Sequence, residues 1–288
     1  MNQELADLLD LLDLEQIEVN MFRGTSPTEG WQRVYGGQVI GQALVAASRT
    51  VEDQSRTAHS LHGYFLRPGD TTIPILYSVD RIRDGKSFTT RRVVAIQKGQ
   101  AIFSMSVSFQ VLEQGFEHQA SPPAVPPPED CMSEREIHER HRESIPEAFQ
   151  DRVERPRPIE MRFAEPLNEY APEKAPPFQH VWIRTVDVMP DDDRLNQCLL
   201  AYASDMTLLD TSYRPHAIGW GDQNFQVASL DHAMWFHRPF RTDDWLLYQQ
   251  DSPFSGGARG FSRGLIYNTA GQLISSVAQE GLIRIHGG

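Results

Sequence analysis

Residues 229–240 read SLDHAMWFHRPF and bring together side chains that could do chemistry. A serine precedes an Asp231–His232 pair, and His237 follows a few residues later. Asp and His beside a serine are the partners that activate a nucleophilic hydroxyl. Neighbouring strand residues point to opposite faces, however, so Asp231 and His232 cannot easily act together on one substrate atom. We therefore interpret His232, His237 and Trp235 as packing and strand-edge residues.

Familiar catalytic and metal-binding motifs are absent or out of context. The one match to G-x-S-x-G, GFSRG at 260–264, lies within the strand-like run 258–269 rather than at a strand-to-helix turn, so it is no nucleophile elbow. H-E-x-x-H, C-x-x-C and Walker loops do not occur, which disfavours the corresponding metalloenzymes and nucleotide-binding proteins. Cys131 and Cys198 give neither a disulfide framework nor metal spacing. His138 and His141 lie in a charged stretch, where solvated surface is the expectation. His59 is expected to pack, with lining of a site as its alternative. We expect no metal and no cofactor.

Charge and length limit the classes of partner. A net charge of −12 argues against general nucleic-acid or anionic-membrane binding, although an anionic small ligand feels only local charge. No apolar run approaches the roughly 18 residues of a membrane span. The N-terminus, MNQELADLLDLLDLEQIE, is acidic, whereas a signal or transit peptide is basic there. We expect a cytoplasmic protein that does not bind membranes, and its 288 residues favour about two domains.

The elements that must position these residues occur twice. Each half has one long helix followed by strand-like runs rich in β-branched and aromatic residues. A proline-rich and charged stretch at 113–155 separates them, so we expect domains at 1–112 and 156–288 with a linker between. The predicted helices are 4–17, 36–50 and 192–205, and the predicted strands are 59–68, 73–84, 87–98, 100–111, 179–185, 227–240, 244–254, 258–269 and 272–286.

The two halves can be registered on each other. Tyr77 and Tyr248, like Gly85 and Gly256, are 171 positions apart, whereas the helices register at 156. The difference of 15 is a longer helix-to-strand loop in the second half. Two copies indicate a duplicated domain rather than a solenoid. One helix cannot cover both faces of a sheet, so we expect α+β copies, each an antiparallel sheet wrapped around its helix and paired edge to edge.

Several blocks carry a resemblance to a known family. GGQVIGQALVAAS, HSLHGYFLRPGD, IRDGKSFTTRRVVAIQKG, YASDM, SLDHAMWFHRPF and AQEG are similar, in this order, to the acyl-CoA thioesterase II family, the "double hotdog" thioesterases. The resemblance runs almost end to end. It implies two fused hotdog folds, hydrolysis of acyl-CoA to CoA and free acid, and homo-oligomers. It also implies that an Asp, a Thr or Ser and a Gln hold a water, with no covalent nucleophile.

The resemblance transfers these three roles to Asp205 of YASDM, Ser229 of SLDHAM and Gln279 of AQEG. Many family members have threonine at the position of Ser229, and serine keeps the hydroxyl. An aspartate near the end of a helix opposes the helix dipole, so its placement calls for a functional reason. An aspartate is ionised at neutral pH and can accept a proton from water.

The internal repeat provides a separate argument. Asp205 registers with Arg49, and the other two members of the set register with Ala58 and Ser108. Because only the second copy carries the polar set, we expect one active site per chain. Gly36 and Gly37 open the first long helix, whose bare N–H groups could bind the thioester carbonyl; the other interpretation is close helix packing.

Two alternatives from other functional classes stay open. A hotdog enoyl-CoA hydratase would use a G-D-x-N-P-L-H-type segment, of which GDQNF at 221–225 copies only the first part. A hotdog protein could also bind acyl-CoA as a sensor without turnover, but a sensor would not need the Asp, Ser and Gln set. Release of free thiol from acyl-CoA separates the three functions.

Overall fold

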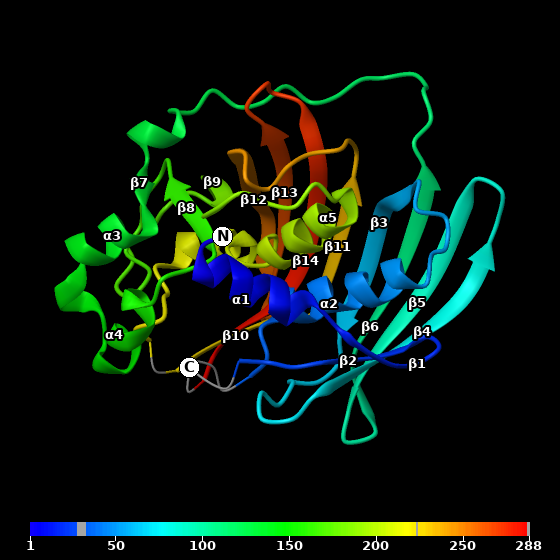
Figure 1. Ribbon diagram of the computed structural model, residues 1–288. Coiled ribbons are helices and arrows are strands. Elements are labelled where there is room, and N and C mark those ends of the chain that lie inside the picture. Colours follow the sequence, from blue (N-terminus) through cyan, green and yellow to red (C-terminus); the bar gives the residue numbers. More distant parts are fainter. Residues whose placement is uncertain (28–32, 223, 287–288) are drawn as a thin grey trace.

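The computed structural model describes residues 1–27, 33–222 and 224–286. In this part of the chain the strands form one 14-stranded sheet in which each pairing is antiparallel. The strands follow one another across the sheet in the order β1-β2-β4-β5-β6-β3-β11-β14-β13-β12-β9-β8-β7, and β10 also pairs with β14. The expected α+β class and antiparallel sheet are therefore present (Figure 1).

The helices are α1 (Gln3–Leu12), α2 (Gly36–Arg49), α3 (Glu134–Arg140), α4 (Glu147–Glu154) and α5 (Asp193–Ala203), with 3-10 turns η1 (Pro128–Asp130), η2 (Arg142–Ser144), η3 (Leu208–Ser212) and η4 (Arg214–His216). The strands are β1 (Glu15–Glu18), β2 (Met21–Gly24), β3 (Arg56–Phe65), β4 (Ile75–Asp84), β5 (Phe88–Gln97), β6 (Gln100–Val111), β7 (Met132–Ser133), β8 (Ile159–Phe163), β9 (Phe178–Thr185), β10 (Phe225–Ser229), β11 (Asp231–Phe236), β12 (Leu246–Gly256), β13 (Arg259–Asn268) and β14 (Leu273–Ile285). None of the described helices is long and apolar enough to cross a membrane.

Strand β3 of the first half and strand β11 of the second half pair edge to edge. His62 lies opposite Ala233 in this antiparallel pair. These positions are 171 apart, which is the offset between the repeated strands. His62 and Ala233 are the one pair of equivalent residues in this ladder that face each other, as a pseudo-twofold axis through the junction requires. The sheet continues from one copy into the other without an intervening edge.

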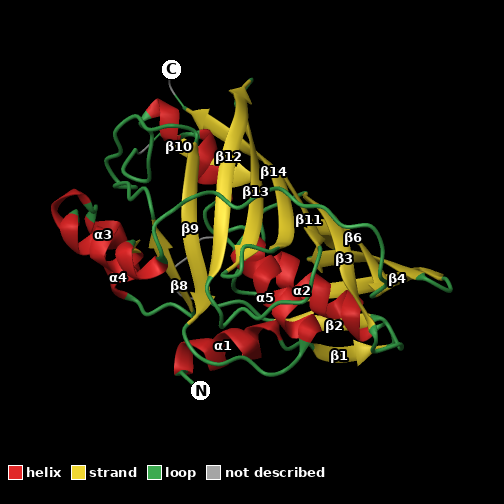
Figure 2. Ribbon diagram, turned by 90° about the horizontal axis from the view of Figure 1, so that it is seen from above, coloured by secondary structure: helices red, strands yellow, loops and turns green. Residues whose placement is uncertain are grey.

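Helices α2 and α5 lie side by side and antiparallel on the same face of the sheet (Figure 2). Gly41 of α2 faces α1 and α5: a Cβ there would lie 2.9 Å from the Leu12 side chain and 3.2 Å from the carbonyl oxygen of Cys198. The C-terminal end of α5 consequently lies against the N-terminal end of α2. Hydrophobic residues of both helices and the facing strands form one core.

Several predicted elements differ from the observed ones; β3, for example, covers 56–65 rather than 59–68. The N-terminal helix ends at Leu12 rather than continuing to 17, because residues 15–24 form the β1–β2 hairpin. The second long helix ends at Ala203, so its last two predicted residues lie outside it. The strand predicted at 227–240 is broken at Leu230 into β10 and β11.

A β-bulge causes the break at Leu230. Ser229 pairs with Gly281 and Ala233 pairs with Ala278, so one strand uses one residue more than its partner. Strand β3 shows the same irregularity between Ala58 and Ser60 opposite β6. The bulges occupy equivalent positions of the two repeats, and the candidate site lies beside the second one.

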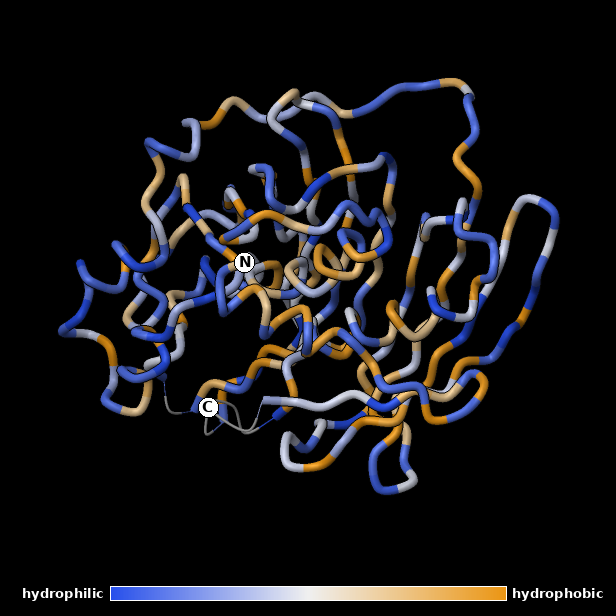
Figure 3. The backbone as a smooth tube through the Cα atoms, in the orientation of Figure 1, coloured by the Kyte–Doolittle hydropathy of each residue, from blue (hydrophilic) through white to orange (hydrophobic). Residues whose placement is uncertain are grey.

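The connection between the copies has two parts. The part after β6 passes over the sheet to β7 and is mostly hydrophilic (Figure 3). The part that follows contains α3 and α4, and β7 pairs with β8 at the end of the sheet. The charged stretch thus forms the helix α3, while the boundaries 1–112, 113–155 and 156–288 stay a prediction.

Candidate active site

Asp205 lies where the two long helices meet. It follows Ser204, the C-cap of α5, and contacts the start of α2. A Cβ at Gly36 would lie 2.5 Å from Asp205 Oδ2, and the Gly37 N–H donates a hydrogen bond to the carboxylate. The negative end of α5 disfavours a carboxylate, whereas the positive end of α2 favours one. The first copy thus offsets the unfavourable position of Asp205 on the second.

Ser229 and Gln279 converge on the same carboxylate. The Gln279 Nε2 amide donates to Asp205 Oδ1 at 2.5 Å and to Ser229 Oγ at 2.7 Å. The Ser229 hydroxyl donates to Asp205 Oδ1 at 3.1 Å. Ser229 ends β10 and Gln279 lies on β14 opposite the bulge. The structure therefore brings all three sequence-predicted residues into one closed triangle.

Burial dominates the electrostatics of this triangle. It raises the pKa of Asp205 from 3.8 to about 6, although the hydrogen bonds from Gln279, Ser229 and Gly37 act in the opposite direction. A carboxylate with this pKa is a better proton acceptor than an exposed one and is still mostly ionised at neutral pH. The site thus holds a tuned base next to two polar groups.

One polar atom of the Gln279 side chain has no hydrogen-bond partner among the described residues. Gln279 is fully buried, and within the described residues its Oε1 has no hydrogen-bond partner. Both Nε2 hydrogens are used by Asp205 and Ser229. A buried acceptor without a partner is unfavourable in a finished core. Gln279 Oε1 can therefore accept a hydrogen bond from a small donor such as water.

Aromatic side chains of the first copy lie near the start of α2, and the sequence reasoning did not identify them. The Tyr35 hydroxyl donates to the Tyr202 carbonyl at 3.0 Å, and the two rings pack edge to face. The Phe65 ring would lie 3.0 Å from a Cβ at Gly36 and packs on Phe103. Tyr35 directly precedes the two glycines in the sequence, and that proximity is the signal that could have indicated it.

In the first half, other side chains surround the bulge at the place that corresponds to the triangle. The Gln197 side chain accepts from the Ala58 N–H at 3.0 Å and donates to the Ala58 carbonyl at 2.7 Å. Arg49 donates to the Leu14 carbonyl and to Asp13. His59 bonds Ser108 at 2.8 Å and packs on Phe88, which favours its packing interpretation. The two copies thus differ in the surroundings of Asp205 and Arg49 as well as in these two residues.

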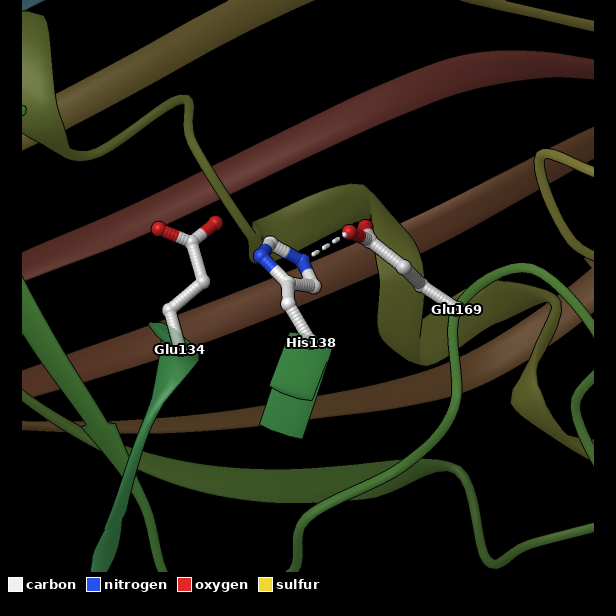
Figure 4. A group of neighbouring side chains, drawn as sticks. All are labelled: Glu134, His138 and Glu169. Atoms are coloured by element: carbon white, nitrogen blue, oxygen red, sulfur yellow. Dashed lines mark hydrogen bonds and ion pairs between the residues drawn. The ribbon is translucent and has the colours of Figure 1, made fainter. Parts of the chain in front are cut away.

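A second polar cluster corrects the expectation of a solvated His138. This residue is buried, and its Nε2 lies 2.9 Å from Glu169 Oε1, with Glu134 beside it (Figure 4). One ligand atom of each residue lies within 4.8 Å of the others. Arg157 pairs with Glu134 at 3.1 Å and Arg152 also acts on both glutamates. Two arginines that balance two carboxylates indicate a partly exposed ion-pair network around the buried His138.

The GDQNF segment, considered above for a hydratase, contains Gln223, which lies outside the described residues. Its Asp222 accepts a hydrogen bond from the Gly219 N–H at 2.9 Å. The Asp222 N–H in turn donates to the Gly219 carbonyl. Asp222 therefore closes a tight turn in the longer helix-to-strand loop of the second copy.

The fold places the chain in a structural class. A protein of unknown function with a hot dog fold from Alicyclobacillus acidocaldarius superposes with a TM-score of 0.75, at 15% identity over 96% of this chain and 97% of its own. An acyl-CoA thioesterase II, TesB2, from Mycobacterium marinum superposes with a TM-score of 0.78, at 45% identity over 97% of this chain and 98% of its own. The chain has a hot-dog-type fold.

Sequence comparisons narrow the class to a family. The family model of acyl-CoA thioesterase matches residues 148–282, and the family model of the acyl-CoA thioesterase N-terminal domain matches residues 25–110. Acyl-CoA thioesterase 2 of Haemophilus influenzae is 41% identical over 99% of both chains. The chain belongs to the acyl-CoA thioesterase family, as the resemblance of its motifs implied.

Proposed function

We propose that the protein hydrolyses acyl-CoA thioesters to free fatty acid and CoA with a water held by Asp205, Ser229 and Gln279. The observation that carries the proposal is the closed triangle of these side chains around a carboxylate, with Gln279 Oε1 left as a buried acceptor. The names of the relatives support the substrate class. Asp205 accepts one proton of the water, and Gln279 Oε1 accepts a hydrogen bond from the second water hydrogen.

The reaction proceeds by addition and elimination. The water oxygen forms a bond to the thioester carbon as its proton passes to Asp205. The carbon–sulfur bond then breaks, the electron pair leaves on the CoA sulfur, and the proton held by Asp205 neutralises that thiolate. The products are the carboxylic acid and the free thiol. A thioester is already activated, so this scheme needs neither a covalent nucleophile nor a metal or organic cofactor.

The start of α2 is the proposed place for the carbonyl oxygen. Partial positive charge at a helix N-terminus stabilises the oxyanion that develops there. The Gly37 N–H already donates to Asp205, so Gly36 is the donor we assign to the carbonyl. Close packing explains Gly37 on its own, because a Cβ there would lie 2.2 Å from the Tyr202 carbonyl oxygen. Gly37→Ala would therefore disturb packing and cannot test the oxyanion role.

The proposed architecture is a pair of fused hotdog units, at 1–112 and 156–288, joined by a linker at 113–155. The two family matches and the repeat offset at the β3–β11 junction support it. We further propose a homo-oligomer. The edge strand β1 is exposed and begins and ends with a glutamate, which discourages edge pairing, whereas Tyr64 on the outer face is 64% exposed. The outer face is the better candidate for contact between copies.

The test is thiol release from acyl-CoA substrates of increasing chain length. Hydrolysis gives free thiol, whereas hydration of an enoyl-CoA and simple binding do not. Gln279→Ala and Ser229→Ala should lower turnover on the best substrate, because each removes a group that orients the water. Absence of thiol release across the whole series, with acyl-CoA bound, would favour a binding protein. Formation of a 3-hydroxyacyl-CoA would favour a hydratase.

A further inference from the structure

The Asp231–His232 pair has no part in the proposed chemistry, yet both side chains are engaged beside it. Asp231 Oδ1 accepts the Glu280 N–H at 2.7 Å, and Glu280 follows Gln279 in the chain. His232 Nε2 lies 2.9 Å from Ser204 Oγ, and Ser204 precedes Asp205. Each member of the pair therefore binds the direct neighbour of a residue in the triangle.

The bulge explains the role of Asp231. At Leu230 the extra residue interrupts the hydrogen-bond ladder between β10–β11 and β14. The Leu230 N–H still donates to the Glu280 carbonyl at 2.9 Å. The Glu280 N–H donates to the Asp231 side chain in place of a backbone carbonyl. The Asp231 carboxylate thus closes the ladder at the residue after Gln279 and fixes the direction of the Gln279 side chain.

His232 acts on the other end of the triangle. It is fully buried, and the Ser204 hydroxyl donates its one hydrogen to the Ala201 carbonyl at 2.9 Å. His232 Nε2 must therefore be the donor to Ser204 Oγ, which assigns the neutral tautomer with its hydrogen on Nε2. Its Nδ1 has no partner among the residues that the structure describes. The Tyr248 hydroxyl holds the Ser204 carbonyl at 3.0 Å.

We propose that Asp231 and His232 are positioning residues that hold the backbone beside Gln279 and Asp205, without contacting the substrate themselves. The inference rests on the proposed function of the triangle. The first copy has the same bulge but carries Ser60 and Leu61 at the equivalent positions, and it lacks the polar set. The bulge therefore forms without an Asp–His pair. The triangle occurs in the second copy, which is the copy that carries the pair.

The test pairs a disruptive with a conservative substitution at each position. Asp231→Ala removes the acceptor, whereas Asp231→Asn keeps an oxygen that can accept the Glu280 N–H. His232→Leu copies the residue of the first repeat, whereas His232→Gln keeps a donor near the place of Nε2. His237→Gln is the matched control from the same stretch. His237 forms an exposed hydrogen bond with Ser276 and contacts no neighbour of the triangle through it.

We expect the disruptive variants to lose roughly 10- to 100-fold in kcat with KM within about threefold, because misplacement by about 1 Å has effects of this size. The conservative variants should recover most of kcat, and the control should match the parent. The acid limb of the pH–rate profile should persist in His232→Gln, since the histidine is not the base. Where Asp231→Ala fails to fold, Asp231→Ser replaces it, since serine stands at that place in the first copy.

Three outcomes would overturn the inference. Parental kcat in both disruptive variants, while Gln279→Ala and Asp205→Asn lose turnover, would leave the proposed function intact and refute the positioning roles. Equal loss in His232→Gln and His232→Leu together with loss of the acid limb would make His232 itself the proton acceptor. Full turnover in Asp205→Asn and Gln279→Ala would instead refute the proposed function on which the inference rests.

Discussion

Replacing Asp205 by asparagine should make the protein less active and more stable at alkaline pH. The substitution keeps the shape of the side chain and an oxygen that can accept from Gln279 and Ser229. It removes the negative charge that burial disfavours. Turnover should fall on the order of 10²-fold or more, because the substitution removes the general base that we propose. Opposite changes in activity and stability are expected of a strained functional group.

The size of the stability gain follows from the pKa. Burial raises the pKa of Asp205 from 3.8 to about 6, so the folded protein binds this proton more tightly than the unfolded chain. Stability therefore falls as pH rises from about 4 to 6, and the full difference, about 3 kcal/mol, is present above pH 7. The asparagine amide would face the Gly37 N–H, and two opposed donors cost about 1–2 kcal/mol. The net gain at pH 8 should be about 1–2 kcal/mol.

Urea unfolding of both proteins at pH 8 and pH 5 measures this effect, and thiol release measures turnover. The stability advantage of Asp205→Asn should shrink from pH 8 to pH 5, because the parent carboxyl is then largely protonated. Asp210→Asn is the comparison, since Asp210 is another carboxyl of raised pKa that does not belong to the triangle. Parental turnover in Asp205→Asn, or an equal stability difference at both pH values, would refute the reasoning.

Four further outcomes are expected. The kcat/KM of the parent should fall as pH decreases through about 6, the pKa of Asp205, and a flat profile from pH 5 to 8 would contradict its role as base. Ser229→Thr should keep turnover within about threefold in the thiol-release assay, since it keeps the hydroxyl that acts in the site. Gly264→Ala should lower the free energy of unfolding by about 1–3 kcal/mol in urea, because its Cβ would lie 2.2 Å from the Tyr248 ring. Light scattering should give a mass above the 32.7 kDa of one chain, and the mass of a monomer would refute the homo-oligomer.

The sequence predicted the parts of the fold that depend on periodicity and repetition. Helix α2 begins at Gly36 as predicted, and the two residues that face each other at the centre of the β3–β11 junction, His62 and Ala233, are separated by the repeat offset of 171. Asp205, Ser229 and Gln279 came from the resemblance of the motifs, and the repeat showed that they belong to one copy. These signals are local or pairwise in the sequence, so they can be read without coordinates.

The features that sequence reasoning missed depend on tertiary contacts. The residues on both sides of Leu230, FQVAS and DHAMWF, include neither glycine nor proline, so no turn residue in the sequence marks the break. His138 stands in a charged stretch, and its burial follows from Glu169, which is far away in the chain. Gly41 packs on α5 rather than on the sheet because the two long helices lie next to each other, and the spacing within either helix does not encode that contact.

The site depends on both copies although its polar residues come from one. A carboxylate just after a helix C-terminus meets the negative end of the helix dipole, and burial adds to that penalty. The α2 N-terminus of the other copy supplies the N–H of Gly37 and the positive end of a dipole. At the equivalent place in the first copy Arg49 follows this logic, since a cation is favoured at the C-terminal end of α2. The charges of Arg49 and Asp205 are thus each compatible with the helix ends around them. Of the two, only the Asp205 carboxylate can act as the base that we propose.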